Sequence, residues 1–331
     1  MHQDLTLFVA RLRTLAEQPL PSVTKQLNHQ ALFAALLSNQ LLAQVGATAS
    51  TQARQAIQQY FEAVLLCRQQ QLLGAQHALS RADASLLALP AVAVEVATLF
   101  QLSAWGNYYY ANQEGDRAVV ALRQGLILSA KLERRGYTAL IHRRIEQLQN
   151  VATIYFQQQQ PAEAGQLLRN ALSFVVTGQV QDLLIEDWEA SGLRQVPALH
   201  EHTLRGLLAY VATRLGTPAS SPFDDDYRRF FQDLLRKFTA DTYNQVVLYN
   251  WLFISISYLE EGLRGFLHNV GEFLADAEIT ASYDMFKVNL LQQVLVASAA
   301  YPGYPAVAEA AQAFAARRLR DHAGRPVKLA A

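Results

Sequence analysis

Histidine and carboxylate side chains at helical spacing come nearest in this sequence to a reactive or metal-binding site. The candidates are His142 with Glu146, His268 with Glu272, and the run His200-Glu201-His202. A pair four residues apart supplies two ligands at most, whereas a zinc site needs three or four converging groups. Because no His-Glu-x-x-His or second matching motif occurs, we interpret these residues as hydrogen-bonded surface pairs. We therefore expect no metal and no cofactor.

Motifs for nucleophilic catalysis and phosphate binding are also absent from the sequence. There is no Gly-x-x-x-x-Gly-Lys-Ser/Thr loop, no Gly-x-Gly-x-x-Gly after a strand and no Gly-x-Ser-x-Gly elbow. The single cysteine, Cys67, ends an apolar helical run, so we interpret it as buried and inert, with a reactive thiol as the alternative. We expect a protein that is not an enzyme. A catalytic site between the two halves of the chain, built on His200 to His202, is the competing hypothesis.

Four arginines form one local basic concentration: Arg134, Arg135, Arg143 and Arg144. Guanidinium groups hold carboxylates with two parallel hydrogen bonds, so an acidic motif can dock there. The alternative is a set of ordinary exposed arginines on a helix face. Over the whole chain, 28 lysines and arginines balance 28 aspartates and glutamates, without the charge excess of nucleic-acid or anionic-membrane binders. We expect no nucleic-acid partner and no membrane partner.

Aromatic side chains cluster at Trp105, Tyr108, Tyr109 and Tyr110. Three consecutive helical positions cannot all face a core, so at least one of the tyrosines should reach the surface. An exposed tyrosine is a common interface anchor, although packing explains most such clusters. We keep both interpretations for Trp105 and Tyr108.

The elements that position these residues are predicted to be helices throughout. Alanine, leucine, glutamine and arginine dominate, alternation with period two is absent, and glycine or proline recurs at intervals of roughly twenty residues. Apolar residues fall at three-and-four spacing, as from Leu5 to Leu15, which gives each helix one buried stripe. Helices of similar length with short connections form antiparallel hairpins. The predicted fold is an all-α solenoid of hairpins followed by a C-terminal helical bundle.

A domain boundary is predicted at Gly216–Pro222, where two prolines and a glycine interrupt helix formation. This divides the chain into a hairpin region at 1–215 and an aromatic-rich helical region at 224–322. The tail at 323–331 is predicted to be disordered.

A repeated spacing supports the hairpins. A small residue in one helix is followed twelve residues later by alanine in the next, in the pairs Ala63 with Ala75, Gly106 with Ala118, and Ala152 with Ala164. Twelve residues cover the end of one helix, a tight turn and the start of the next, so the small residues should face each other where the helices cross. The alternative is an irregular helical bundle in which such spacings arise from ordinary packing.

This pattern resembles the tetratricopeptide repeat family over roughly residues 55–178, most closely from Leu148 to Leu172. The copies are 43 and 46 residues apart against about 34 in the family, so the resemblance is to a long-helix variant. It implies a groove, lined by the first helix of each hairpin, that binds an extended or helical peptide. Asn107 and Asn150 correspond to groove asparagines that hold the peptide backbone, while Ser103 replaces the first lysine of carboxylate-clamp members.

The groove candidates are therefore Asn107, Asn150, Trp105, Tyr108, Arg143 and Arg144. The function we expect is a non-enzymatic scaffold or adaptor for a protein or peptide partner. The alternative is a regulatory protein whose C-terminal region responds to a bound peptide. No signal peptide is visible, and the apolar run Val246 to Leu259 is shorter than the ~20 residues of a membrane span. We expect a cytoplasmic protein.

Overall fold

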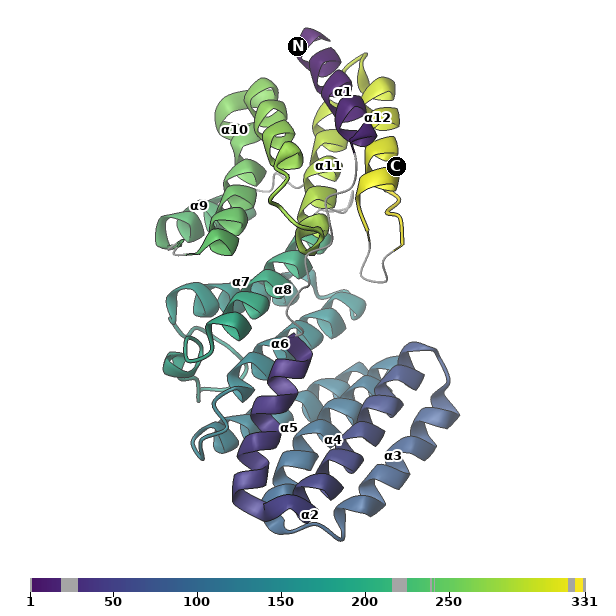
Figure 1. The fold of residues 1–331 in the computed structure, drawn as a ribbon, viewed down its shortest axis with the longest axis vertical. Helices are drawn as coiled ribbons and strands as arrows, with labels where there is room; N and C mark the ends of the chain where they lie inside the picture. The colour runs from purple at the N-terminus through teal and green to yellow at the C-terminus, as the bar shows by residue number, and fades with distance from the viewer. Residues whose placement is uncertain are drawn as a thin grey trace. The chain divides into compact units, whose positions relative to one another are not determined.

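The computed structural model describes residues 2–18, 29–215, 225–238, 240, 242–320 and 325–329, and they are predominantly helical (Figure 1). Within these residues there is no strand, and the only β-pairing is one isolated bridge between Arg320 and Pro326. The prediction of an all-α fold is confirmed.

The chain divides into two compact units. The hairpin unit is Asn28–Leu207, and the split unit combines Met1–Leu27 with Leu208–Ala331. This differs from the predicted division at 1–215 and 224–322, because helix α1 (His2–Glu17) packs against α10 (Tyr243–Ala275) and α12 (Tyr304–Arg318). The predicted boundary at Gly216–Pro222 lies outside the described residues.

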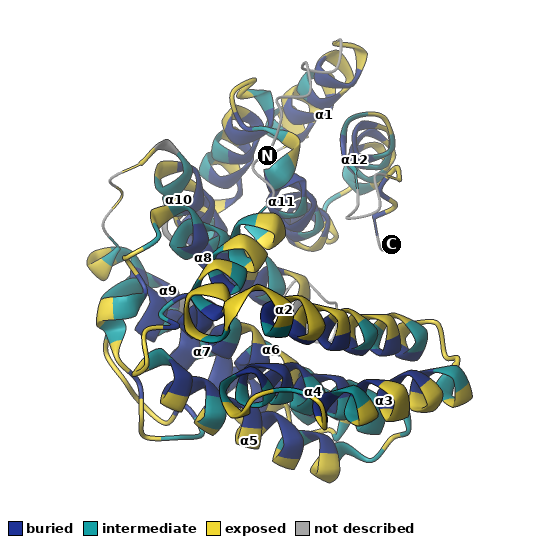
Figure 2. Cartoon of the chain, turned by 60° about the horizontal axis from the view of Figure 1, so that its bottom comes forward, coloured by how far each residue is buried: buried dark blue, intermediate teal, exposed yellow. Residues whose placement is uncertain are grey.

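The hairpin unit consists of consecutive helices with short connections. Its elements are α2 (His29–Arg68), α3 (Leu72–Leu86), α4 (Ala91–Ala111), α5 (Gly115–Glu133), α6 (Leu140–Gln157), α7 (Pro161–Thr177), η1 (Ala190–Gly192) and the first part of α8 (Pro197–Leu215). α2 packs on α3 and α4, α4 on α5, α5 on α6, and α6 on α7. Figure 2 shows buried residues on the faces that these helices turn toward each other and exposed residues on their outer faces.

One turn geometry closes three successive hairpins. In each of these turns a glutamine adopts the left-handed conformation. The glutamine is Gln70 (φ 61°) between α2 and α3, Gln113 (φ 65°) between α4 and α5, and Gln159 (φ 60°) between α6 and α7. The following N–H then bonds five residues back, from Gln71 to Leu66, Glu114 to Tyr109 and Gln160 to Tyr155, at 2.8–2.9 Å. This is the Schellman arrangement, which satisfies carbonyls at the helix end.

Small residues permit close helix approach within the hairpins. Ala63, Ala75, Ala118, Ala152 and Ala164 are fully buried. A Cβ added to Gly106 would lie 3.1 Å from the Leu122 side chain and 3.6 Å from the Ala118 carbonyl oxygen. The predicted contact between α4 and α5 at Gly106 and Ala118 is confirmed.

The interior of the split unit includes a polar network as well as aromatic packing. Its further elements are α9 (Asp225–Lys237), η2 (Ala281–Tyr283) and α11 (Asp284–Ser298). Trp251 packs edge-on against Phe286 and donates its indole N–H to Asn289 Oδ1 at 3.2 Å. Asn289 in turn donates to the Ala212 carbonyl at 2.9 Å, which links α8, α10 and α11.

The C-terminal segment differs from the predicted disordered tail. Of 323–331 the structure describes 325–329, in which Val327 and Leu329 are buried. The Leu329 N–H donates to Gln312 Oε1 at 3.0 Å, and the Val327 N–H donates to the Leu319 carbonyl at 3.3 Å. Two apolar side chains and these bonds hold the segment against α12 despite Pro326.

One helix among the described residues, α2, is long and apolar enough to cross a membrane when judged by length and composition alone. The apolar run noted in the sequence, Val246 to Leu259, belongs to a different helix, α10 (Tyr243–Ala275). α2 is interrupted at Gly46, whose φ of 77° and ψ of 173° are not helical. α2 therefore consists of two helical segments, 29–45 and 47–68.

Replacing Gln159 by glycine should stabilise the hairpin unit by about 0.5–1 kcal/mol. A side chain in the left-handed region costs roughly 1–2 kcal/mol, part of which the greater unfolded-state freedom of glycine offsets. Urea denaturation followed by circular dichroism measures the change. Gln159→Ala is the control, because it retains the Cβ and should give no gain; equal stabilisation by both variants would contradict this account of the turn.

Candidate functional site

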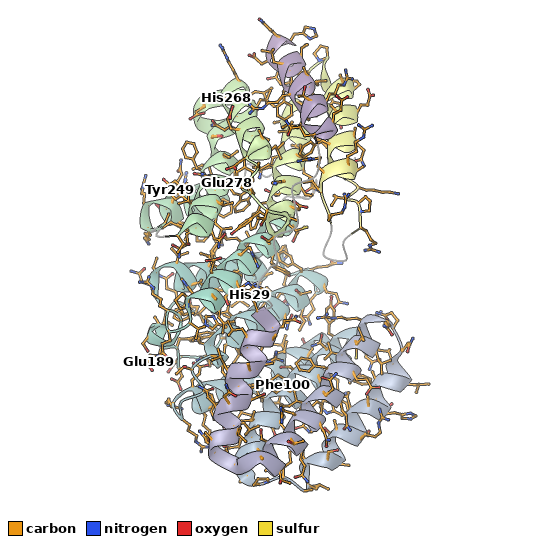
Figure 3. All side chains as sticks on the ribbon, in the orientation of Figure 1. His29, Phe100, Glu189, Tyr249, His268 and Glu278 are labelled. Carbon is orange, nitrogen blue, oxygen red and sulfur yellow. The ribbon has the colours of Figure 1, made fainter. Side chains whose placement is uncertain are left out.

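Side chains of α2, α4 and α6 meet in a row that we call the inner row: Phe61, Phe100 and Arg143. The rings of Phe61 and Phe100 are 5.5 Å apart in an edge-on arrangement. The Arg143 guanidinium lies 4.5 Å from the centre of the Phe100 ring, which Figure 3 labels. Phe61 is 47% exposed, so the row begins with an accessible aromatic surface.

Arg143, the last member of the inner row, has a carboxylate of opposite charge beside it on α6. Arg143 lies 3.9 Å from Glu146, whose side chain is 56% exposed. Partial burial lowers the pKa of Arg143, and the neighbouring Glu146 carboxylate partly offsets that shift. The row therefore offers one apolar and one charged end to a ligand.

The two predicted asparagines lie on the helix faces that carry the inner row. Asn107 follows Phe100 by seven residues on α4, and Asn150 follows Arg143 by seven on α6, which is two turns in each helix. Asn150 is exposed. Asn107 is half-buried and donates its amide N–H to the Ser103 carbonyl at 2.8 Å. Ser103, in turn, accepts a 3.0 Å bond from Gln147 that joins α4 to α6.

The structure places Trp105 and Tyr108 in a packed cluster facing α3. Asp83 on α3 accepts three hydrogen bonds, from Tyr60 Oη at 2.7 Å, Gln101 Nε2 at 2.8 Å and Trp105 Nε1 at 3.2 Å. The Tyr108 ring packs edge-on against Trp105 at 5.5 Å. The Trp105 indole N–H is thus bonded inside the hairpin unit, and the contacts of both groove candidates, Trp105 and Tyr108, agree with the packing interpretation.

Arg144, predicted as a surface contact, is instead a buried structural residue. Only 1% of its side chain is exposed; it donates to Glu133 Oε2 at 2.9 Å and to the Asp187 carbonyl, and it stacks 3.8 Å from the Trp188 ring centre. Arg144 therefore anchors the long non-helical segment between α7 and α8 to α5 and α6. Sequence spacing alone carries no signal for this contact, which spans 43 residues.

The carboxylate beside Arg144 is strongly perturbed. Burial raises the pKa of Glu133 to about 7, although the neighbouring Arg144 opposes the rise. Its atom Oε1 is buried and has no hydrogen-bond partner among the described residues. The raised pKa follows from the enclosed position of the Glu133–Arg144 pair.

The other arginines of the basic concentration are also neutralised. Arg134 lies 3.2 Å from Asp187 Oδ2, and Arg135 forms an ion pair with Glu95, which Lys131 also contacts at 2.6 Å. Arg134 and Arg135 are thus exposed and ion-paired, which agrees with the alternative interpretation as ordinary exposed arginines, whereas Arg143 is partly exposed and Arg144 is buried.

The structure does not show the predicted His142–Glu146 pair, whereas His268 acts on Glu272 and, after Arg11 as the main cause, helps to lower the pKa of that carboxyl. His142 is buried and bonds Thr203 Oγ1 at 2.9 Å instead of Glu146. His200 Nε2 lies 3.1 Å from the Val175 carbonyl, and Glu272 bonds Arg11 at 2.8 Å. In the part of the chain that the structure describes, no three histidine, cysteine or acidic side chains are arranged to hold a metal. Cys67 is buried, as predicted, and burial raises its pKa.

A cavity of about 590 Å³ opens in the split unit between α1 and α10, lined by Asp4, Leu7, Arg11, Arg264 and His268 among others. Its charged groups are largely occupied with each other and their neighbours. Arg11 bonds Glu272 at 2.8 Å, and Arg264 lies 3.5 Å from Asp4.

Comparison with known proteins finds no protein-family model, no curated protein and no solved structure that matches this chain.

Replacing Asp83 by alanine should destabilise the hairpin unit by about 3 kcal/mol, since three partly buried donors lose their acceptor. Urea denaturation would measure this change. Asp116→Ala is the matched control, because Asp116 is exposed and accepts one bond, from Gln158, so the expected loss is below about 1 kcal/mol. Equal losses in the two variants would refute the structural role of Asp83.

Replacing Arg144 by alanine should cost about 3–5 kcal/mol, because Glu133 is left buried without its cation. Arg134→Ala is the comparison: Arg134 contacts the same Asp187, but through an exposed pair that contributes less than about 1 kcal/mol. Chemical denaturation of both variants at pH 8 tests the difference. A loss below about 1 kcal/mol for Arg144→Ala would show that the pair does not anchor the segment.

Proposed function

We propose that this protein is a non-enzymatic scaffold or adaptor that binds a peptide segment of a partner along α2, α4 and α6. The inner row is the observation that carries the proposal, because it brings together side chains of three successive hairpins, from the exposed Phe61 through the buried Phe100 to the partly exposed Arg143. An aromatic anchor beside a cation and an amide is a combination enriched in protein interfaces.

The proposed roles follow from the chemistry of the side chains. Phe61 and the nearby Leu65, which is 54% exposed and one helical turn away, receive an apolar side chain of the peptide. Arg143 and Glu146 pair with charged or polar groups. Asn150 bonds the peptide backbone, since an amide donates and accepts at once, and the Asn107 carbonyl provides a second acceptor.

We further propose that the hairpins form a tetratricopeptide-like array. Three pairs of small residues share the twelve-residue offset, and three turns share the left-handed glutamine and the same backbone bonds. In such arrays the first helices of the hairpins line the ligand groove, which agrees with the positions of the inner row.

Selection of phage-displayed random peptides on the intact chain tests the proposal. Selected peptides should bind Phe61→Ser and Asn150→Ala at least about tenfold more weakly than the parent chain, as expected for loss of a contact worth more than ~1.4 kcal/mol. Leu87→Ser, which removes a 90% exposed leucine outside the inner row, should bind unchanged. Peptides that bind all four chains equally would place the site elsewhere and overturn the proposal.

A further inference from the structure

The cavity of the split unit lies where α10 bends. The bend is at Gly262, whose φ of 69° and ψ of −177° are not helical. Residues on both sides of this bend form one wall, and Asp4, Leu7, Phe8 and Arg11 of α1, which follow one another at helical spacing, form the other. Its volume of about 590 Å³ falls within the range of roughly 300–1,000 Å³ that is usual for small-molecule sites.

Part of the cavity lining is apolar and open to water. Phe8 and Leu267 are buried, whereas Leu7 is 62% exposed. Covering such a side chain with an apolar group removes its surface from water, which is favourable. The cavity therefore favours a ligand with an apolar body.

The acidic side chains of the wall already have donors beside them. Arg264 Nε lies 3.5 Å from Asp4 Oδ1. Asn269 Nδ2 donates to Glu261 Oε2 at 2.9 Å, which holds this carboxylate along α10. A cationic ligand would have to compete with both donors.

Two basic side chains of the wall, Arg11 and His268, still have N–H groups to offer. Arg11 uses Nη1 to bond Glu272 Oε1 at 2.8 Å, and the other N–H groups of its guanidinium remain for a ligand. His268, labelled in Figure 3, is exposed and forms no hydrogen bond or ion pair with the described residues. The unused capacity of the cavity is thus for an acceptor with negative charge.

Arg11 and His268 already act on one carboxylate, that of Glu272. The hydrogen bond from Arg11 is the main cause that lowers the pKa of Glu272, and the charge of His268 adds to it. Arg11 also lies against Gly271, where an added Cβ would be 3.0 Å from Nη1 and 3.1 Å from Cδ. The close contact with Gly271 therefore helps to position the guanidinium independently of Glu272, whose side chain is 60% exposed.

We propose that this cavity binds a small amphiphilic carboxylate. The charged end meets Arg11 and His268, through the charge-assisted hydrogen bonds that such groups form with carboxylates. The apolar body covers Leu7 and contacts Phe8. Glu272 competes with the ligand, because both present a carboxylate to Arg11. The site belongs to the split unit and is separate from the peptide binding proposed for α2, α4 and α6.

Isothermal titration calorimetry of the full chain with octanoate tests the proposal. Octanoate should bind at one site per chain and at least about tenfold more tightly than octylammonium, which has the same apolar chain and the opposite charge. Equal affinities for the two probes, or no binding of octanoate at millimolar concentration, would overturn the proposal.

Variants of the lining place octanoate in the cavity. Arg11→Gln removes a charged donor and Leu7→Ser removes apolar surface, so each should weaken octanoate binding by about tenfold. Arg13→Gln is the matched control on α1, because Arg13 is exposed, lies 3.8 Å from Glu309 and does not line the cavity, so this variant should bind unchanged. Equal binding by all three variants would put octanoate elsewhere and refute the site.

Glu272→Gln gives a result that loss of folding cannot produce. It removes the competing carboxylate, so octanoate should bind about two- to fivefold more tightly, as expected for release of an exposed ion pair. Weaker binding by this variant would contradict the proposed competition. Phe61→Ser should leave octanoate binding unchanged, which separates this site from the inner row.

Circular dichroism of each variant checks that the helices remain folded.

Discussion

Close approach of paired helices at buried alanine and glycine is the constraint on which the hairpin unit depends. At Gly106, where α4 meets α5, an added methyl group would lie only 3.1 Å from the Leu122 side chain. Because closely packed interiors are hardly compressible, the position of one helix fixes the position of the helix packed against it. The distances at which α4 packs on α5 and α5 packs on α6 determine the separation of α4 from α6. That separation in turn determines whether the side chains of the inner row can touch.

Polar groups then determine how the packed helices are arranged. Asp83 joins α2, α3 and α4 through three donors, and Ser103 joins α4 to α6. Arg144 joins the segment between α7 and α8 to α5 through its bonds to the Asp187 carbonyl and to Glu133. Such contacts are directional, whereas alanine packing is not, so they select one arrangement among several that bury equal apolar area.

Local patterns predicted the helices and the small-residue contacts, because apolar periodicity and a twelve-residue offset are properties of neighbouring residues. Contacts between distant residues were beyond this reasoning. His142 was paired with Glu146 by spacing but bonds Thr203, and Arg144 was placed on the surface but meets Asp187 and Trp188. Phe61, the proposed aromatic anchor, was not predicted from the sequence. Its signal in the sequence is the apolar pair that it forms with Leu65, one helical turn later on α2.

The assignment of α1 to the split unit has a consequence for synthesis of the protein on the ribosome. α1 emerges first, but its packing partners α10 and α12 lie more than two hundred residues further along the chain. At a synthesis rate of about 5–20 residues per second, the apolar stripe of α1 stays exposed for on the order of ten seconds to a minute before α10 and α12 can cover it. The hairpin unit can complete its own packing within that interval. The nascent chain therefore carries an unburied amphipathic helix ahead of a folded unit, which is a situation that favours chaperone binding to residues 2–17.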